Sequence, residues 1–146
     1  MRSLGRRVLT IDDEITPLDA TLAELVTATA PGLLGLHGVG VDTAAILCVA
    51  AGDNPQRVRS EAAWAHLCGI APLEATSGKL TRRHRLNGGN RQANHALGRI
   101  VFTRLGSDAR TRTYLARRLD QGPSRPEIIR SLKPYVARET YRHLPR

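Results

Sequence analysis

The chain has 146 residues and a formal net charge of +9; 41% of its residues are apolar but only 3% are aromatic, so one domain with a core of Ala, Leu, Val and Ile is expected. No run approaches the roughly 20 apolar residues that span a bilayer, the N-terminus lacks the apolar stretch of a signal peptide, and two cysteines are too few for a disulfide framework. Membrane, secreted and disulfide-rich classes are therefore excluded, and a reducing cytoplasmic setting is expected.

The first predicted element is a helix within residues 11–30. Its apolar residues step by three and four, the seam spacing of a coiled coil. They are Ile11, Ile15, Leu18, Leu22 and Leu25, followed by Thr29. Pro17 predicts that the helix proper begins near Thr16, with the proline in its first turn. Residues 1–30 are thus expected to form an N-terminal arm, in which helix 16–30 either pairs with a partner helix or docks on residues 31–146.

A glycine-rich turn follows, with Gly38-Val39-Gly40 leading into a small-residue helix from Asp42 to Ala51. This pattern resembles a helix-hairpin-helix, in which glycines let the backbone approach a phosphate and helix N–H groups bind it. Gly38 and Gly40 are therefore candidate nucleic-acid contacts. The alternative is a turn used only for packing, and Asp42 in the first turn of the helix would repel phosphate.

The next helix is expected from Glu61 to Cys68, with Ser60 as its N-cap, Gly69 as its stop, and Trp64 and Leu67 as core anchors. Residues 71–90 then lack a helical apolar period, which predicts a long surface loop or a loose hairpin.

That loop begins the basic half of the chain, since residues 1–74 sum to −4 and residues 75–146 to +13. Such a surplus favours a polyanionic partner, above all nucleic acid, although a solvated basic surface remains the alternative. The candidate contacts here are Lys79, Arg82, Arg83, Arg85, Asn87, Asn90 and Arg91. Ser77 beside Gly78 has the hydroxyl that a phosphodiester-attacking serine needs, but Ser-Gly is common in loops, so these residues alone favour phosphate binding over catalysis.

Three helices are predicted after the loop, which makes the fold mainly α with no confident strand. The first runs from Asn90 to Leu105 and buries a stripe of Ala93, Leu97, Ile100, Val101 and Leu105. Ser107 is expected to cap the second, which ends near Gln121. Ser124 and Glu127 form the capping box of the third, which Pro134 is expected to bend or split.

The remaining reactive side chains have ordinary explanations. The histidines share no metal-ligand spacing, so no metal site or cofactor is expected in this chain. Cys48 and Cys68 lie on apolar helix faces and are expected to be inert. Three tyrosines on amphipathic helices (Tyr114, Tyr135 and Tyr141) are explained by packing rather than by attack on DNA.

Five ordered motifs resemble the C-terminal transposase domain of the insertion-sequence 110/116/902 family. They are the Gly38-Val39-Gly40 hairpin, Ala51-Gly52-Asp53, the segment from Leu67 to Pro72, Ser77-Gly78, and Gly89-Asn90-Arg91 at a helix start. The resemblance covers nearly the whole chain. It implies a DNA recombinase in which the serine, here Ser77, attacks DNA and becomes covalently linked to it.

The resemblance also implies partners. Family members carry an RNase H-like domain with metal-binding acids, followed by a coiled coil, ahead of this domain, and several are guided by a bridge RNA. We expect that acidic domain, and the Mg²⁺ it would hold, to be missing from this chain. The expected partners are DNA, a guide RNA, and a second copy or a full-length transposase through helix 16–30, in the nucleoid of a bacterium.

Three functional interpretations stay open. The first is a serine-bearing transposase part that is catalytically incomplete alone. The second is a non-catalytic basic helix-hairpin-helix protein that binds DNA or RNA, and the third is an inactive remnant of an insertion sequence. The first two share every electrostatic expectation and differ at Ser77.

Overall fold

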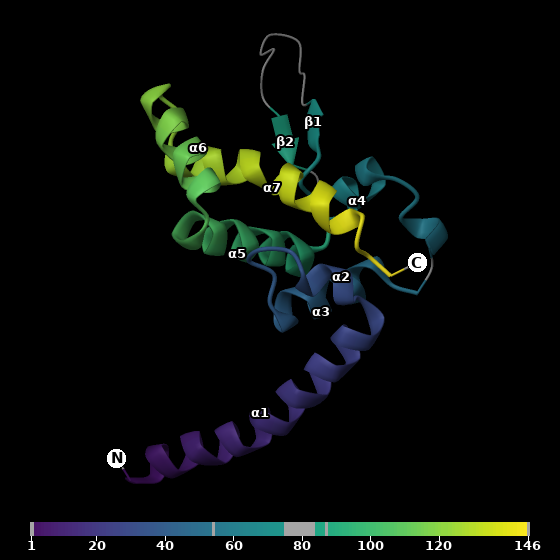
Figure 1. The fold of residues 1–146 in the computed structure, drawn as a ribbon, viewed down its shortest axis with the longest axis vertical. Coiled ribbons are helices and arrows are strands. Elements are labelled where there is room, and N and C mark those ends of the chain that lie inside the picture. Colours follow the sequence, from purple (N-terminus) through teal and green to yellow (C-terminus); the bar gives the residue numbers. More distant parts are fainter. Residues whose placement is uncertain (1, 54, 75–83, 87, 146) are drawn as a thin grey trace.

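A computed structural model describes residues 2–53, 55–74, 84–86 and 88–145. Its elements are α1 (Arg2–Thr29), α2 (Pro31–Leu34), α3 (Val41–Ala51), a 3-10 turn (Pro55–Arg57), α4 (Glu61–Leu67), β1 (Pro72–Glu74), β2 (His84–Leu86), α5 (Arg91–Ser107), α6 (Ala109–Asp120) and α7 (Arg125–Tyr141). The fold is mainly α, as the sequence predicts (Figure 1). No helix in the described ranges has the length and apolar character that crossing a membrane requires.

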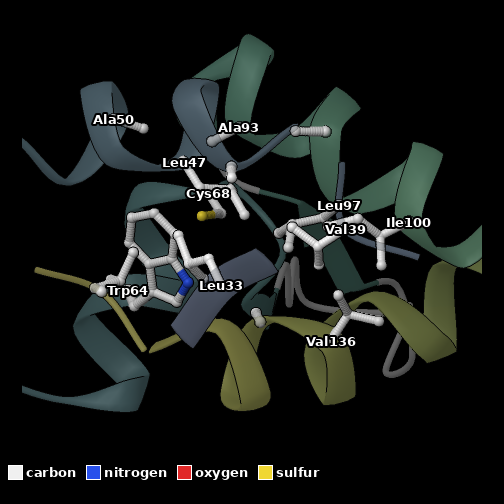
Figure 2. Packing of buried hydrophobic residues seen from close by; sticks show 14 of the residues in the cluster. Leu33, Val39, Leu47, Ala50, Trp64, Cys68, Ala93, Leu97, Ile100 and Val136 are labelled. Carbon is white, nitrogen blue, oxygen red and sulfur yellow. The ribbon is translucent and has the colours of Figure 1, made fainter. Parts of the chain in front are cut away.

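The core forms where α5 packs against both α3 and α7, which are its main neighbours. The predicted apolar stripe of α5 is buried along its whole length, which confirms the helical period expected there. Figure 2 shows Leu97 and Ile100 of α5 facing Val136 of α7. Trp64 of α4 is fully buried, and its Nε1 donates a hydrogen bond to Oγ1 of the equally buried Thr140, 3.2 Å away. This aromatic anchor joins α4 to α7.

Helix α1 differs from the prediction, because it begins at Arg2 rather than near Thr16 and continues through Pro17. Proline removes one helical hydrogen bond, but this part of α1 is exposed, so water can bond the freed carbonyl of Asp13. The hydroxyl of Thr16 also bonds the neighbouring carbonyl of Asp12 at 2.8 Å. The first two-thirds of α1 extend away from the other helices (Figure 1), and the buried Val26 anchors its last turns.

Helix starts follow the predicted caps in two cases out of three, and Asn90, predicted as the first residue of its helix, is the N-cap of α5. Oγ of Ser60 accepts from the amide of Ala63, Asn90 caps α5, and Ser124 forms a capping box with Glu127. The prediction for Ser107 is wrong, because it is the last residue of α5 and its hydroxyl bonds the carbonyl of Thr103.

Asp108 caps α6 instead. Its backbone is extended (φ −101°, ψ 117°) and its carboxylate accepts the amide of Thr111 at 2.9 Å. The hydroxyl and the backbone amide of Thr111 both donate to this carboxylate, and these two hydrogen bonds lower the pKa of Asp108. The predicted split at Pro134 is also wrong, since α7 runs without interruption from Arg125 to Tyr141, and the exposed position of Arg130 leaves its carbonyl open to water.

The segment 71–90 contains two short strands that the sequence did not indicate with confidence. β1 and β2 pair antiparallel, with Leu73 opposite Arg85, so the ends of the predicted loop form a hairpin. Two strands of three residues can pair through their backbones without an alternation of apolar and polar side chains. The sequence pattern therefore left a loop and a loose hairpin both open, and the structure has the hairpin.

Candidate nucleic-acid interface

The glycine-rich turn packs tightly against α5. Gly38 has a left-handed backbone (φ +80°), and a Cβ there would lie 3.2 Å from the carbonyl oxygen of Ile100 and 3.3 Å from Cγ of Arg104. Arg104 of α5 also bonds the turn, since its Nε donates to the carbonyl of His37 at 2.8 Å, and its Nη1 pairs with Glu139 of α7 at 2.7 Å. The geometry around Gly38 is thus that of a packing turn.

Gly40 is the N-cap of α3, and its amide is already bonded. The amide donates to Oγ1 of Thr43 at 3.0 Å, and that hydroxyl donates back to the carbonyl of Gly40 at 2.9 Å. Asp42 in the same turn is 3.7 Å from the guanidinium of Arg99. A phosphate at this helix start would therefore meet one amide fewer and one carboxylate more than a helix-hairpin-helix offers, and the two glycines are not shown as contacts.

Most of the predicted loop contacts lie outside the described residues. These are Ser77, Lys79, Arg82, Arg83 and Asn87. Arg85 is placed by its backbone alone, on β2. Whether these residues gather at one catalytic site is therefore not tested by the described part of the chain.

The C-terminal end of that loop is fixed firmly. A Cβ on Gly89 would lie 2.6 Å from the carbonyl oxygen of Leu67, so only glycine fits between the loop and the end of α4. Asn90 donates its amide to the same carbonyl at 2.7 Å and caps α5 through Oδ1, which accepts from Ala93 at 3.0 Å. Asn90 thus has a structural task, whereas Arg91 beside it is exposed.

A basic face runs along α5 and extends the predicted contact at Arg91. Arg91, His95 and Arg99 recur every four residues and are exposed on one side of the helix. Together with α7 they line a groove of about 360 Å³, here called the α5 groove. Its other polar and aromatic lining residues are Asn94, Phe102 and Lys133. The spacing of these side chains places them off the apolar stripe in the sequence itself, but the contribution of α7 could not be read from the sequence.

A larger cavity of about 540 Å³ lies between α5, α6 and α7, with Tyr114 and Tyr135 in its lining. The hydrogen bond between Nε2 of His37 and Oγ of Ser107 (2.8 Å) lies near its rim. The hydroxyl of Ser107 donates to a helix carbonyl, so it is not polarised as a nucleophile by His37. Two pairs of side chains in this lining are bonded to each other, Arg104 with Glu139 and Asp108 with Thr111.

The cysteines and histidines give no sign of a metal centre in the described ranges, where no three side chains of His, Cys, Asp or Glu come together. Cys68 is buried, and burial raises the pKa of its thiol to about 12. Cys48 is half-buried beside the core, and burial also raises its pKa. Both thiols are thus protonated and poorly nucleophilic near neutral pH.

Comparison with known proteins identifies the family. A family profile described as "Transposase IS116/IS110/IS902 family" matches residues 31–116, more than half of the chain. A protein of Streptomyces coelicolor, described as "Insertion element IS110 uncharacterized 43.6 kDa protein", is 31% identical over 130 residues, which cover 87% of this chain and 32% of that relative. The chain thus spans about a third of the length of the relative it matches. With its helical core and its serine-bearing basic segment, the chain belongs to the IS116/IS110/IS902 family of transposases.

Proposed function

We propose that this chain is the DNA-binding, serine-bearing C-terminal part of a transposase, acting in DNA transposition and site-specific recombination. The observation that carries the proposal is the anchoring of the Ser77 segment at both ends. The paired strands β1 and β2 flank it, and Gly89 and Asn90 lock its end to α4. The proposal is that Ser77 and the arginines of this segment act on the same phosphodiester.

In the proposed chemistry, Oγ of Ser77 forms a bond to phosphorus while the bond from phosphorus to one sugar oxygen breaks. The hydroxyl proton passes to a base, and the departing sugar oxygen takes up a proton. Residues 75–91 contain no carboxylate, and the described residues gather no metal-ligand set. Activation, and any Mg²⁺, is therefore assigned to carboxylates contributed by a longer relative, and no step is routed through a metal here.

The test is a covalent adduct. Labelled DNA, a guide RNA and Mg²⁺ are mixed with this chain and with the preceding part of a longer relative supplied in trans, and products are separated on a denaturing gel. We expect an adduct that Ser77→Ala abolishes and the neighbouring Thr76→Ala preserves. An adduct that survives Ser77→Ala places the nucleophile elsewhere, and an adduct formed by this chain alone contradicts its catalytic incompleteness.

DNA binding is proposed to depend on the phosphate contacts of the basic half of the chain. Replacing Arg82, Arg83 and Arg85 together by alanine removes up to three such contacts, so the slope of log affinity against log salt should fall by about 2.7 on duplex DNA. Equal effects on unrelated sequences would show backbone contact rather than base readout. Binding without an adduct under all conditions would favour the non-catalytic alternative, a basic module that holds DNA or RNA.

A second copy of the chain is the proposed partner of α1. Its apolar seam starts at Leu4 and Val8 and continues through the predicted positions to Leu25. Leu4, Leu18 and Leu25 are 70%, 67% and 59% exposed. In the heptad register of this seam, Val8 and Ile15 stand at a positions and Leu4, Leu18 and Leu25 at d positions, which favours two parallel strands. Ile11 at a d position and Leu22 at an a position depart from that pattern.

Light scattering tests the dimer against the chain mass of 15.9 kDa. Leu18→Glu should yield monomers, whereas Leu9→Glu should leave the dimer intact. The two leucines are matched controls, because they are 67% and 66% exposed and only Leu18 lies on the seam. A wild-type chain that stays monomeric at high concentration would refute the pairing.

A further inference from the structure

The α5 groove carries basic side chains that are open to an anion from outside the chain. Arg91 and His95 are exposed and make no side-chain hydrogen bond or ion pair with the described residues. Arg99 lies 3.7 Å from Asp42, and both side chains are at least half exposed, so this pair is weak and can yield to another anion. Arg91 and Arg99 are eight residues apart, about 12 Å along the helix, which is the axial length of roughly three or four stacked nucleotides.

Lys133 of α7 is held in place on the opposite wall. Its Nζ donates to Oδ1 of Asn94 at 2.7 Å and to the carbonyl of Asn94 at 3.3 Å. The side-chain amide of Asn94 is fixed in turn, since it donates to the carbonyls of Cys68 and Gly69. Gly98 lets the lysine lie flat, because a Cβ there would be 3.3 Å from Cε of Lys133. The ammonium is thus oriented before any ligand arrives, and partial burial lowers its pKa.

An aromatic side chain stands in this cationic setting. Phe102 is 59% exposed on α5 and lines the groove. Exposure of a phenyl ring is unfavourable unless something covers it, and here the surrounding charges are positive. A positively charged groove with an exposed aromatic ring is the arrangement by which proteins hold unpaired nucleotides, with phosphates along the cations and a base stacked on the ring.

We propose that the α5 groove binds a single strand of DNA, with its phosphates along Arg91, His95 and Arg99 and one base stacked on Phe102. The proposal rests on the proposed function for its choice of DNA, since the groove starts at Arg91, directly after the Gly89-Asn90 anchor of the serine segment. A duplex fits less well, because its bases are already stacked on each other and Phe102 would have to wedge between them. The contacts of the groove do not include Ser77, because the basic side chains and the ring of Phe102 supply them.

The test measures fluorescence anisotropy of a labelled oligothymidylate, an oligouridylate of the same length and a matched duplex with the whole chain. Phe102→Ala should raise Kd for oligothymidylate about 5- to 150-fold, the range expected for loss of one base–aromatic stack, and Phe102→Trp should retain affinity. Tyr135→Ala is the matched control, because Tyr135 is 57% exposed but lies outside the α5 groove. Arg91→Ala with Arg99→Ala should lower the salt slope by about 1.4 for a single strand.

Four results overturn the proposal: equal loss in Phe102→Ala and Tyr135→Ala, no effect of Phe102→Ala, tighter binding of the duplex, or tighter binding of oligouridylate. Thermal melting followed by the fluorescence of the buried Trp64 confirms that each variant is folded. Failure of the proposed function and failure of the groove give different results. Phe102-dependent binding, with no adduct when the preceding part of a longer relative is supplied, keeps the groove and rejects the chemistry, whereas adduct formation undiminished by Phe102→Ala rejects the groove.

Discussion

Gly38→Ala separates packing from phosphate contact in the glycine-rich turn. A left-handed backbone costs an L-residue about 1–2 kcal/mol, and a Cβ placed 3.2 Å from the oxygen of Ile100 and 3.3 Å from Cγ of Arg104 adds strain. Lower entropy of the unfolded chain returns about 0.4–1 kcal/mol, so we expect a net loss of about 2 kcal/mol of unfolding free energy. Gly40 has an extended backbone (φ −102°) with nothing within 4 Å of a Cβ, so Gly40→Ala should cost less than about 1 kcal/mol, its N-cap preference.

Urea unfolding followed by Trp64 fluorescence measures both variants, and anisotropy with labelled duplex DNA measures their affinity where they remain folded. The packing interpretation predicts that Gly38→Ala is the less stable variant and that the affinity of its folded form for DNA is unchanged. Equal stability of the two variants would refute the reasoning. So would a folded Gly38→Ala variant that has lost affinity, since the turn would then contact phosphate directly.

Thr140→Val should lower the free energy of unfolding by about 1–3 kcal/mol, because it leaves the indole N–H of Trp64 buried without its acceptor. The control Thr113→Val, on the exposed face of α6, should change it by less than about 0.5 kcal/mol. Similar losses in the two variants by chemical denaturation would contradict the role of the buried bond. Cys68 keeps its proton to about pH 12 when folded but ionises from about pH 9.0 when unfolded, so its contribution to stability is constant below pH 9.0 and falls as pH rises to 12. Cys68→Ala should reduce this loss of stability at alkaline pH in a series of unfolding measurements. A thiol reagent should label the half-buried Cys48 before the buried Cys68. Simultaneous labelling of both thiols in the native protein would contradict the burial of Cys68.

Local chemistry determined the helix starts. Ser60, Asn90 and Ser124 each act on backbone or side-chain groups three residues away, so their roles can be read from a few consecutive letters. The failure at Ser107 has the same origin, because Asp108 is an equally good cap one position later and the sequence cannot choose between them. The family motifs and the charge asymmetry are likewise properties of the chain order, so the sequence was sufficient for both.

Tertiary structure decided which of these residues meet. Lys133 lies against Asn94 across 39 positions, which turns a basic helix face into the α5 groove, and Trp64 bonds Thr140 across 76 positions. No periodicity of a single helix encodes such pairs, because the first depends on how α5 packs against α7 and the second on how α4 packs against α7. Gly38 shows the same division. Its sequence context allows either a phosphate contact or a packing turn. The close approach of Ile100 and Arg104 of α5, more than sixty positions along the chain, favours packing.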